Sequence, residues 1–196
     1  MLQHKLRAPV GVLINPLCRT LVKVGVRANH LTVIGAVGVS LASLYFFPQG
    51  KFLIGTIAVA LFALLDLLDG TVARMSDSIP SKWGALLDST VDRISDAMIV
   101  VGIAIYLERE TTTSILLPFL VMLTGGLVSY VRARAESLGI ECSVGVGERT
   151  ERLIIILVGT FLFSVGVSGG LVVGLWLVLI VSTLTVAQRL AVVFKA

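Results

Sequence analysis

Long apolar stretches, separated by short groups of charged or turn-forming residues, dominate the chain from residue 31 onward. A helix needs about 20 mostly apolar residues to cross a bilayer, so these stretches predict membrane-spanning helices. The first four lie at approximately 31–47, 52–73, 84–107 and 111–131. Residues 153–188 carry no charge and are too long for one span. The segment 164–170 (SVGVSGG) predicts a turn that divides them into a fifth and a sixth span.

The distribution of basic residues predicts the orientation of these spans. Six spans would place both termini on the same side of the membrane. Of the 16 Lys and Arg residues, only Lys51 and Arg109 lie on the opposite side. Because basic residues concentrate in cytoplasmic segments, we expect cytoplasmic termini and a multi-pass protein of the inner (plasma) membrane.

Residues 1–28 precede the first span and form an interfacial juxtamembrane segment in this interpretation. Leu6, Val10 and Leu13 recur at three- and four-residue spacing beside basic residues, a pattern typical of an amphipathic helix that lies in the membrane interface. A simple basic leader is the alternative. The expected fold is therefore an all-α integral membrane protein, with six transmembrane helices and an N-terminal interfacial amphipathic helix. Residues 1–196 form a single membrane-embedded domain.

Composition supports this class and excludes others. The chain is 56% hydrophobic and 14% charged, whereas soluble domains are about 45–50% apolar and about 25% charged. Two Cys and two His residues leave little basis for a disulfide framework or a zinc site. The net charge of +4 is accounted for by the topology, so it predicts no nucleic-acid partner.

Acidic residues interrupt the second and third spans. Asp66 and Asp69 are three positions apart, and Asp88, Asp92 and Asp96 follow at steps of four. At these spacings each set shares one helix face, and the antiparallel spans place both sets just below the cytoplasmic surface. A charge inside a span costs at least a few kcal/mol and usually faces a partner, a cavity or an ion.

A divalent cation would explain this cluster, because carboxylates gathered in a low dielectric otherwise favour the protonated form. Oxygen ligands without His or Cys suit Mg²⁺ or Mn²⁺, and four carboxylates can hold two such ions. The alternative is a salt-bridged helix hairpin, with Asp66 paired to Arg74 or Asp92 to Arg93. The second pair is disfavoured because adjacent residues on a helix do not easily face each other.

Two stretches of the chain resemble the signature of the CDP-alcohol phosphatidyltransferase family. Asp66 to Arg74 reads DLLDGTVAR and, nine residues later, Gly84 to Asp92 reads GALLDSTVD. Every fixed position of the pattern D-x2-D-G-x2-A-R, then G-x3-D-x3-D, is present. The six expected spans extend the resemblance over essentially the whole chain.

The resemblance implies a membrane transferase in which an acceptor hydroxyl attacks the β-phosphorus of CDP-diacylglycerol and CMP leaves. It implies that Asp66, Asp69, Asp88 and Asp92 bind two divalent metal ions, Mg²⁺ or Mn²⁺. It also implies that Asp92 is the general base, although a role as ligand, base or both stays open. A homodimer is a further implication of the resemblance.

The same resemblance places the nucleotide beside the aspartate motif. The residues expected to contact CDP-diacylglycerol are Gly70, Ala73, Arg74, Gly84, Asn29 and Thr32. Two alternatives stay open: Asn29 and Thr32 also suit the start of a helix, and small residues also serve helix packing.

A second region resembles actinobacterial phosphatidylinositol phosphate synthases, which join inositol phosphate to CDP-diacylglycerol. It comprises Ser129 to Glu136, Glu148 to Ile154 and the segment around Arg189. Its arginines lie on the expected cytoplasmic side, where their forked donors suit phosphate. The expected acceptor-phosphate residues are Ser129, Arg132, Arg152 and Arg189. Interfacial anchoring is the alternative for each arginine. The glycine-containing loop 137–148 is expected to be mobile and to cover the pocket.

The predicted function is therefore transfer of the phosphatidyl group of CDP-diacylglycerol to inositol phosphate, which gives phosphatidylinositol phosphate and CMP. Membrane lipids are the other expected partners. The same chemistry with glycerol 3-phosphate is an alternative, because the aspartate motif does not distinguish acceptors. A cation transporter is an alternative from another class. It is disfavoured because the acidic residues cluster at one end of two spans and the other spans lack them.

Overall fold

The computed structural model describes residues 20, 22, 24, 25, 28–75, 81–110 and 115–196. Within these ranges, the side chains at positions 66, 67, 69, 70 and 73–75 are outside the description. The predicted interfacial helix of residues 1–28 lies almost wholly outside the described residues, so it stays a prediction.

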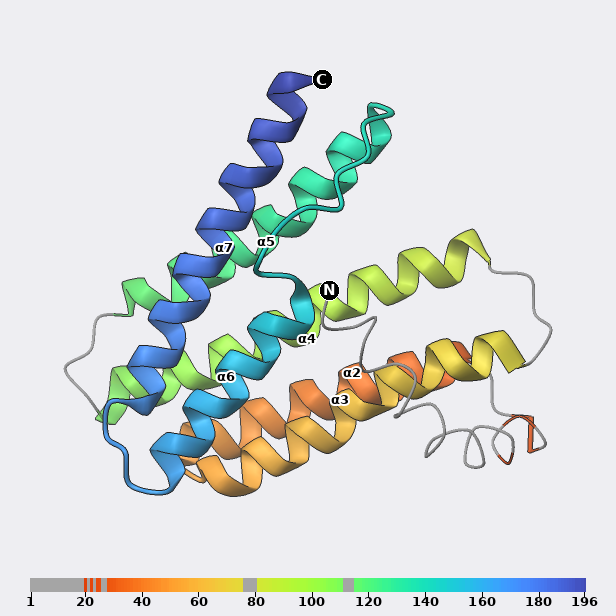
Figure 1. Cartoon of the computed structure of the whole chain (residues 1–196). Helices are drawn as coiled ribbons and strands as arrows, with labels where there is room; N and C mark the ends of the chain where they lie inside the picture. Colours follow the sequence, from red (N-terminus) through yellow and green to blue (C-terminus); the bar gives the residue numbers. More distant parts are fainter. Residues whose placement is uncertain (1–19, 21, 23, 26–27, 76–80, 111–114) are drawn as a thin grey trace. The chain divides into compact units, whose positions relative to one another are not determined.

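Helices make up the regular structure of the described residues, which contain no β-strand (Figure 1). Their bounds are α2 Ala28–Phe46, the 3-10 helix η1 Phe47–Gln49, α3 Phe52–Met75, α4 Lys82–Glu110, α5 Leu116–Ser137, α6 Arg149–Ser164 and α7 Gly170–Lys195. The all-α class is confirmed, and each predicted span has an α-helix in its place. The turn predicted between the last two spans is also present, with Gly166 at φ +97°, a left-handed conformation that glycine adopts without steric cost.

The helix ends differ from the predicted ones because charged residues do not end these helices. Helix α5 continues past Arg132 and Arg134 to Ser137, and α6 begins at Arg149 instead of residue 153. Long arginine side chains can bend toward polar surroundings while their backbone stays helical. Two predicted acceptor residues, Arg132 and Arg152, therefore lie inside helices and not at their ends.

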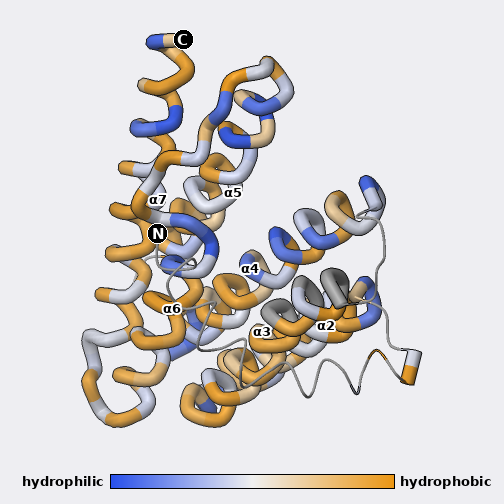
Figure 2. Tube along the Cα trace, turned by 45° about the vertical axis from the view of Figure 1, so that its right-hand side comes forward, coloured by the Kyte–Doolittle hydropathy of each residue, from blue (hydrophilic) through white to orange (hydrophobic). Residues whose placement is uncertain are grey.

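Three described helical segments are long and apolar enough to cross a membrane: Ala28–Gln49, Leu116–Ser137 and Gly170–Lys195. The continuously described apolar part of α3, Phe52–Leu65, is shorter. Helix α6 has 16 residues, or about 24 Å at 1.5 Å per residue. The number of spans therefore stays a prediction. Figure 2 shows hydrophobic residues along most of α7 and hydrophilic ones near its C-terminal end.

The chain forms two compact units, and α2, α3 and α4 contribute to both. The first unit comprises residues up to Ser43 and Ile57–Ile99. It contains a buried cluster of Leu31, Leu68 and Val72. Helices α2 and α3 lie close together at Gly38. A Cβ atom built on this glycine would lie only 2.2 Å from Phe62 Cδ1 on α3, so the close contact requires glycine.

The second unit comprises Leu44–Thr56 and Val100–Ala196, and in it α7 packs against both α5 and α6. Glycines allow α6 and α7 to touch through their backbones. A Cβ atom on Gly159 would lie 3.0 Å from the Gly170 carbonyl oxygen and 3.2 Å from Gly174 Cα. A buried hydrogen bond, 2.7 Å from Thr56 Oγ1 to Thr160 Oγ1, joins α3 to α6. Small and hydroxylated residues are the usual contacts between helices in membranes.

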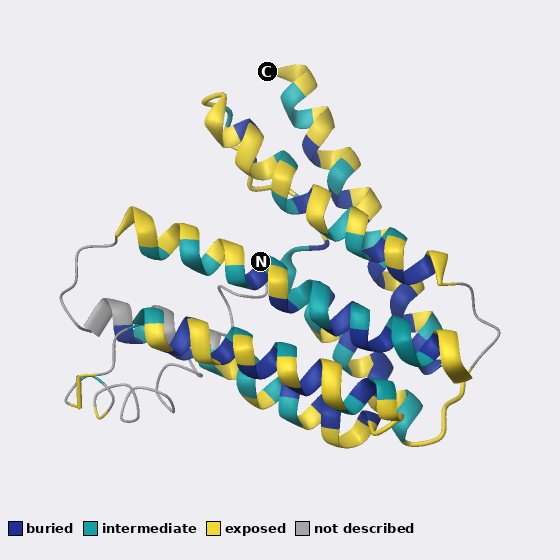
Figure 3. Ribbon diagram, turned by 180° about the vertical axis from the view of Figure 1, so that it is seen from behind, coloured by how far each residue is buried: buried dark blue, intermediate teal, exposed yellow. Residues whose placement is uncertain are grey.

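Burial is distributed in the way expected of a membrane protein. Large apolar side chains such as Leu41, Leu123 and Trp176 are exposed, whereas Arg152 and Arg189 are buried. Figure 3 shows exposed residues along the described helices, interleaved with buried ones. Extensive exposed apolar surface marks contact with lipid or with another protein, and ionisable residues in such helices face the interior.

Candidate active site

The predicted metal-binding residues lie on α3 and α4 in the first unit. Asp66 and Asp69 belong to α3, but their side chains are outside the description. Asp88 and Asp92 lie one turn apart on α4, where Asp88 is half-buried and Asp92 is 8% exposed. No group of three potential ligands is found among the described residues, which leaves the convergence of the four carboxylates as a prediction. Three expected CDP-diacylglycerol contacts on α3 are likewise outside the described side chains: Gly70, Ala73 and Arg74.

Asp92 is a buried carboxylate with an arginine beside it. Arg93 Nη2 lies 3.8 Å from Asp92 Oδ2, longer than the 2.7–2.9 Å or so of a charge-assisted hydrogen bond. This contact corrects the expectation that adjacent residues do not face each other, since the long arginine side chain bends toward its neighbour. A buried carboxylate needs a nearby positive charge or hydrogen bonds. The all-oxygen donor set of the aspartates suits a hard divalent cation.

The start of α4 brings together two residues expected to contact CDP-diacylglycerol. Ser81 Oγ accepts a hydrogen bond of 2.9 Å from the Gly84 amide, the arrangement by which serine caps a helix. A Cβ atom on Gly84 would lie 3.2 Å from Asn29 Oδ1, so Asn29 on α2 lies directly beside Gly84. Thr32 is buried and its hydroxyl donates to the Ala28 carbonyl at 3.1 Å.

Thr32 does not cap helix α2, whereas the alternative that Asn29 serves the start of the helix stays open. Ala28 is the first described residue of helix α2, and Thr32 lies four residues further along it. The threonine hydroxyl bonds the carbonyl four residues earlier, as threonine does in the interior of a helix. Asn29 lies beside Gly84, near the start of α4.

Arg152 on α6 and Arg189 on α7 are buried in the second unit, 5% and 2% exposed. Arg152 Nη1 donates to the Gly147 carbonyl at 2.7 Å. Arg189 donates through Nε to the Val144 carbonyl at 2.9 Å and through Nη1 to the Val128 carbonyl. An interfacial anchor would extend its charged end into water, so burial argues against that alternative for these two arginines.

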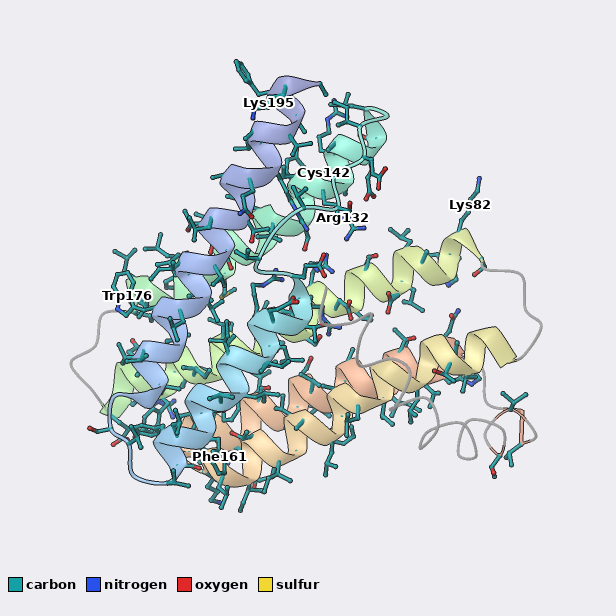
Figure 4. The ribbon with its side chains drawn as sticks, viewed as in Figure 1. Lys82, Arg132, Cys142, Phe161, Trp176 and Lys195 are labelled. Atoms are coloured by element: carbon teal, nitrogen blue, oxygen red, sulfur yellow. The ribbon has the colours of Figure 1, made fainter. Side chains whose placement is uncertain are left out.

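Arg132 and Ser129 lie on α5 and have different surroundings. Arg132 is exposed, and its Nε donates to Glu136 Oε1 at 2.8 Å, one turn further along the helix. Ser129 is half-buried and lies about one turn before Arg132 on the same helix. Figure 4 shows Arg132 on α5 and Cys142 on the loop that follows this helix. Arg132 is thus accessible to a ligand that can compete with Glu136, whereas anchoring at the interface stays open for it.

The loop between α5 and α6 is packed against α7 at two of its residues, and its mobility stays a prediction. Cys142 and Gly147 are buried, and the Gly147 amide donates to Thr185 Oγ1 at 2.8 Å. The loop glycines serve conformation and close packing: Gly139 and Gly145 have φ values of +79° and +136°. Glycine-rich sequence by itself does not distinguish such a packed loop from a free one.

Sequence reasoning missed Thr185, which lies in the charge-free stretch of the sixth predicted span. Its hydroxyl is fully buried and bonded to the loop. The available signal was its position four residues before Arg189, because residues at i and i+4 share a helix face. A polar residue beside an inward-facing arginine is thereby expected to face inward as well.

Comparison with known proteins identifies the family. Residues 26–188 match the sequence model of the CDP-alcohol phosphatidyltransferases. This match covers both aspartate stretches, Arg132 and Arg152, and it ends one residue before Arg189. The chain belongs to the CDP-alcohol phosphatidyltransferase family, and it is an enzyme of the membrane.

Individual relatives narrow the resemblance. The chain is 37% identical over 202 residues to the phosphatidylinositol phosphate synthase of Streptomyces avermitilis, with 98% of this chain and 82% of that protein covered. The solved phosphatidylinositol phosphate synthase of Mycobacterium tuberculosis with CDP-DAG bound is 34% identical. It has a TM-score of 0.85 and covers 91% of this chain and 92% of that one. Its complex with manganese and citrate has a TM-score of 0.86 at the same identity and covers 91% and 88%.

Proposed function

We propose that this enzyme transfers the phosphatidyl group of CDP-diacylglycerol to a hydroxyl of inositol phosphate, which gives phosphatidylinositol phosphate and CMP. Similarity over 98% of the chain to a synthase of that name supports the acceptor. The solved relative with CDP-DAG bound supports the donor. The observation that carries the proposal is the pair of buried arginines, Arg152 and Arg189, because buried cations suit an acceptor that itself carries a phosphate.

The arginines bind the acceptor phosphate in this proposal. A guanidinium has five N–H donors, and Arg189 uses Nε and Nη1 for two backbone carbonyls, which retains donors for phosphate oxygens. These carbonyl contacts also fix the orientation of the guanidinium group. A guanidinium that is already fixed loses less side-chain entropy when it binds phosphate. Arg132 adds a third cation and Ser129 a hydroxyl donor.

The aspartates act on the reacting groups. Asp66, Asp69, Asp88 and Asp92 would hold two Mg²⁺ or Mn²⁺ ions, and manganese in the complex of the solved relative supports divalent metal. Such ions, when bound, neutralise the charge of the pyrophosphate. Asp92 accepts the proton of the acceptor hydroxyl as that oxygen attacks the β-phosphorus and the bond to the CMP phosphate breaks. A buried position suits a base, because it keeps bulk water from the proton transfer.

The nucleotide end is proposed to lie against α2, α3 and α4. Gly84 and Asn29 are neighbours, because a Cβ atom built on Gly84 would lie 3.2 Å from Asn29 Oδ1. Any larger residue at position 84 would therefore crowd the asparagine side chain. Thr32 on α2 completes the described residues of this set, and the remaining members on α3 are Gly70, Ala73 and Arg74.

The substrates also suggest the place of the enzyme in the cell. Acyl chains require the hydrocarbon region, whereas the nucleotide and the sugar phosphate come from the cytosol. We therefore propose six spans with cytoplasmic termini, an active site facing the cytoplasm at the inner membrane, and an interfacial segment at residues 1–28. A single domain over residues 1–196 and a homodimer complete the proposal.

The test is an acceptor panel with purified enzyme and CDP-diacylglycerol in detergent micelles. CMP release and lipid product are measured with inositol phosphate, glycerol 3-phosphate or no acceptor, each with and without EDTA. We expect turnover with inositol phosphate, loss with EDTA, and recovery with added Mg²⁺ or Mn²⁺. Turnover with glycerol 3-phosphate but not with inositol phosphate would show that glycerol 3-phosphate is the acceptor. No CMP release under any condition would contradict the transferase function and favour the transporter.

A further inference from the structure

A buried hydroxyl on α7 is one of the groups that attach the loop between α5 and α6 to this helix, beside the contact of Arg189 with Val144. Thr185 Oγ1 accepts a hydrogen bond from the Gly147 amide at 2.8 Å and donates to the Val181 carbonyl at 2.7 Å. Thr185 is fully buried, so no water replaces either partner. The Thr185 hydroxyl therefore donates its proton to a carbonyl of its own helix, and its oxygen accepts the hydrogen bond from the loop.

The loop packs so closely against α7 that Gly145 and Gly147 have no room for a side chain. A Cβ atom on Gly147 would lie 2.8 Å from the Val181 carbonyl oxygen. A Cβ atom on Gly145 would lie 2.3 Å from Thr185 Cγ2, and the Gly145 φ of +136° suits glycine. Because the obstructing atoms at Gly147 are backbone, they cannot move aside as a flexible side chain can.

The same short loop orients both buried arginines. The Gly147 carbonyl accepts from Arg152 Nη1 at 2.7 Å, and the Val144 carbonyl accepts from Arg189 Nε at 2.9 Å. Both backbone polar groups of Gly147 are thus hydrogen-bonded: its amide donates to Thr185 and its carbonyl accepts from Arg152. Loss of the first bond is expected to release the second.

We propose that Thr185 is a positioning residue for the acceptor: by holding residues 144–147 it sets the guanidinium groups of Arg152 and Arg189 for phosphate binding. This inference rests on the proposed function, which assigns the acceptor phosphate to these arginines. Paired phosphate contacts require a guanidinium in a defined orientation. Here the loop carbonyls of Val144 and Gly147 contribute to that orientation, together with the Val128 carbonyl of α5 for Arg189. Thr185 itself does not touch the substrate.

The experiment compares three variants with the wild type. Thr185→Val removes the hydroxyl at nearly constant volume, and Thr185→Ser keeps it. Thr183→Val is the matched control, because Thr183 is exposed on the same helix and its hydroxyl donates to the Leu179 carbonyl at 2.8 Å. Steady-state kinetics give KM for inositol phosphate, KM for CDP-diacylglycerol and kcat. Hydrogen exchange is followed in peptides that cover residues 140–148.

We expect Thr185→Val to raise KM for inositol phosphate about tenfold, the effect of losing roughly one hydrogen bond to a charged group. Its kcat and its KM for CDP-diacylglycerol should stay within about twofold of the wild type. Exchange in residues 140–148 should be faster. Thr185→Ser and Thr183→Val should match the wild type in all of these measurements. If Thr185→Val does not fold, Gly147→Ala displaces the loop from its own side and should give the same change in acceptor KM.

Three results would overturn the inference. Unchanged exchange and unchanged KM in Thr185→Val would mean that the hydroxyl does not hold the loop. Faster exchange with unchanged acceptor KM would mean that the loop does not set the arginines. An equal effect on both substrates and on kcat would indicate a purely structural role. Failure of the proposed function is distinguishable, because it appears as absent inositol phosphate turnover in the wild type, while the exchange measurement still reports on the hydroxyl and the loop.

Discussion

Replacement of Arg189 by lysine tests whether its carbonyl contacts stabilise the second unit. Arg189 donates to the Val144 carbonyl on the loop, at 2.9 Å, and to the Val128 carbonyl on α5. Arg189→Lys keeps the positive charge but offers a single ammonium on a flexible stem instead of a planar fork. One ammonium cannot occupy both donor positions, so at least one buried carbonyl loses its donor.

The magnitude follows from burial. A buried acceptor left without its donor costs about 1–3 kcal/mol, and each kcal/mol lowers the unfolding midpoint by roughly 2–4 °C for a chain of this size. Arg189→Lys should therefore lower the midpoint by roughly 2–12 °C. Arg134→Lys is the matched control, because Arg134 is exposed and its Nη1 lies 3.4 Å from Ser137 Oγ, a long contact on the surface of α5.

Cys142 provides the assay, because its thiol is buried and Sγ lies 4.0 Å from the Arg189 carbonyl oxygen. In a Cys18→Ser background Cys142 is the remaining cysteine of the two in the chain. A thiol-reactive dye then reports the temperature at which the loop and α7 separate. Equal midpoints and equal labelling rates for Arg189→Lys and Arg134→Lys would refute the reasoning, since the fork would then contribute nothing beyond its charge.

Three further predictions follow from the other described contacts. Asp92→Asn, which keeps the shape of a buried side chain without its basicity, should lower kcat by about 10²–10⁴-fold in the CMP-release assay; full activity would remove Asp92 as the base. Gly84→Ala places a Cβ 3.2 Å from Asn29 Oδ1 and should raise KM for CDP-diacylglycerol without changing KM for the acceptor; the reverse split would contradict a nucleotide site there. Gly159→Val adds atoms against the Gly170 carbonyl, which lies 3.0 Å from the Cβ position, and should destabilise the protein by about 1–3 kcal/mol; an unchanged thermal midpoint would show that α6 and α7 can separate freely.

Local sequence patterns determined the helices and the chemistry expected of them. Apolar stretches of span length predicted α2 to α7, since a helix satisfies its backbone polar groups within itself. Spacings of three and four predicted that the aspartates share helix faces, and the aspartate signature predicted the family, which the comparison confirms. The exact helix ends were less predictable, because arginines continue α5 and α6 instead of ending them.

Tertiary structure alone decided how the second unit uses its polar residues. The acceptors of Arg189 lie 45 and 61 positions away along the chain, and the hydroxyl that holds Gly147 lies 38 positions away. No periodicity or spacing relates such partners, because they are brought together by the packing of α7 against α5 and by the course of a loop. The arginines could be recognised in the sequence as candidates for phosphate, but their burial and the packing of the loop depend on contacts between distant segments.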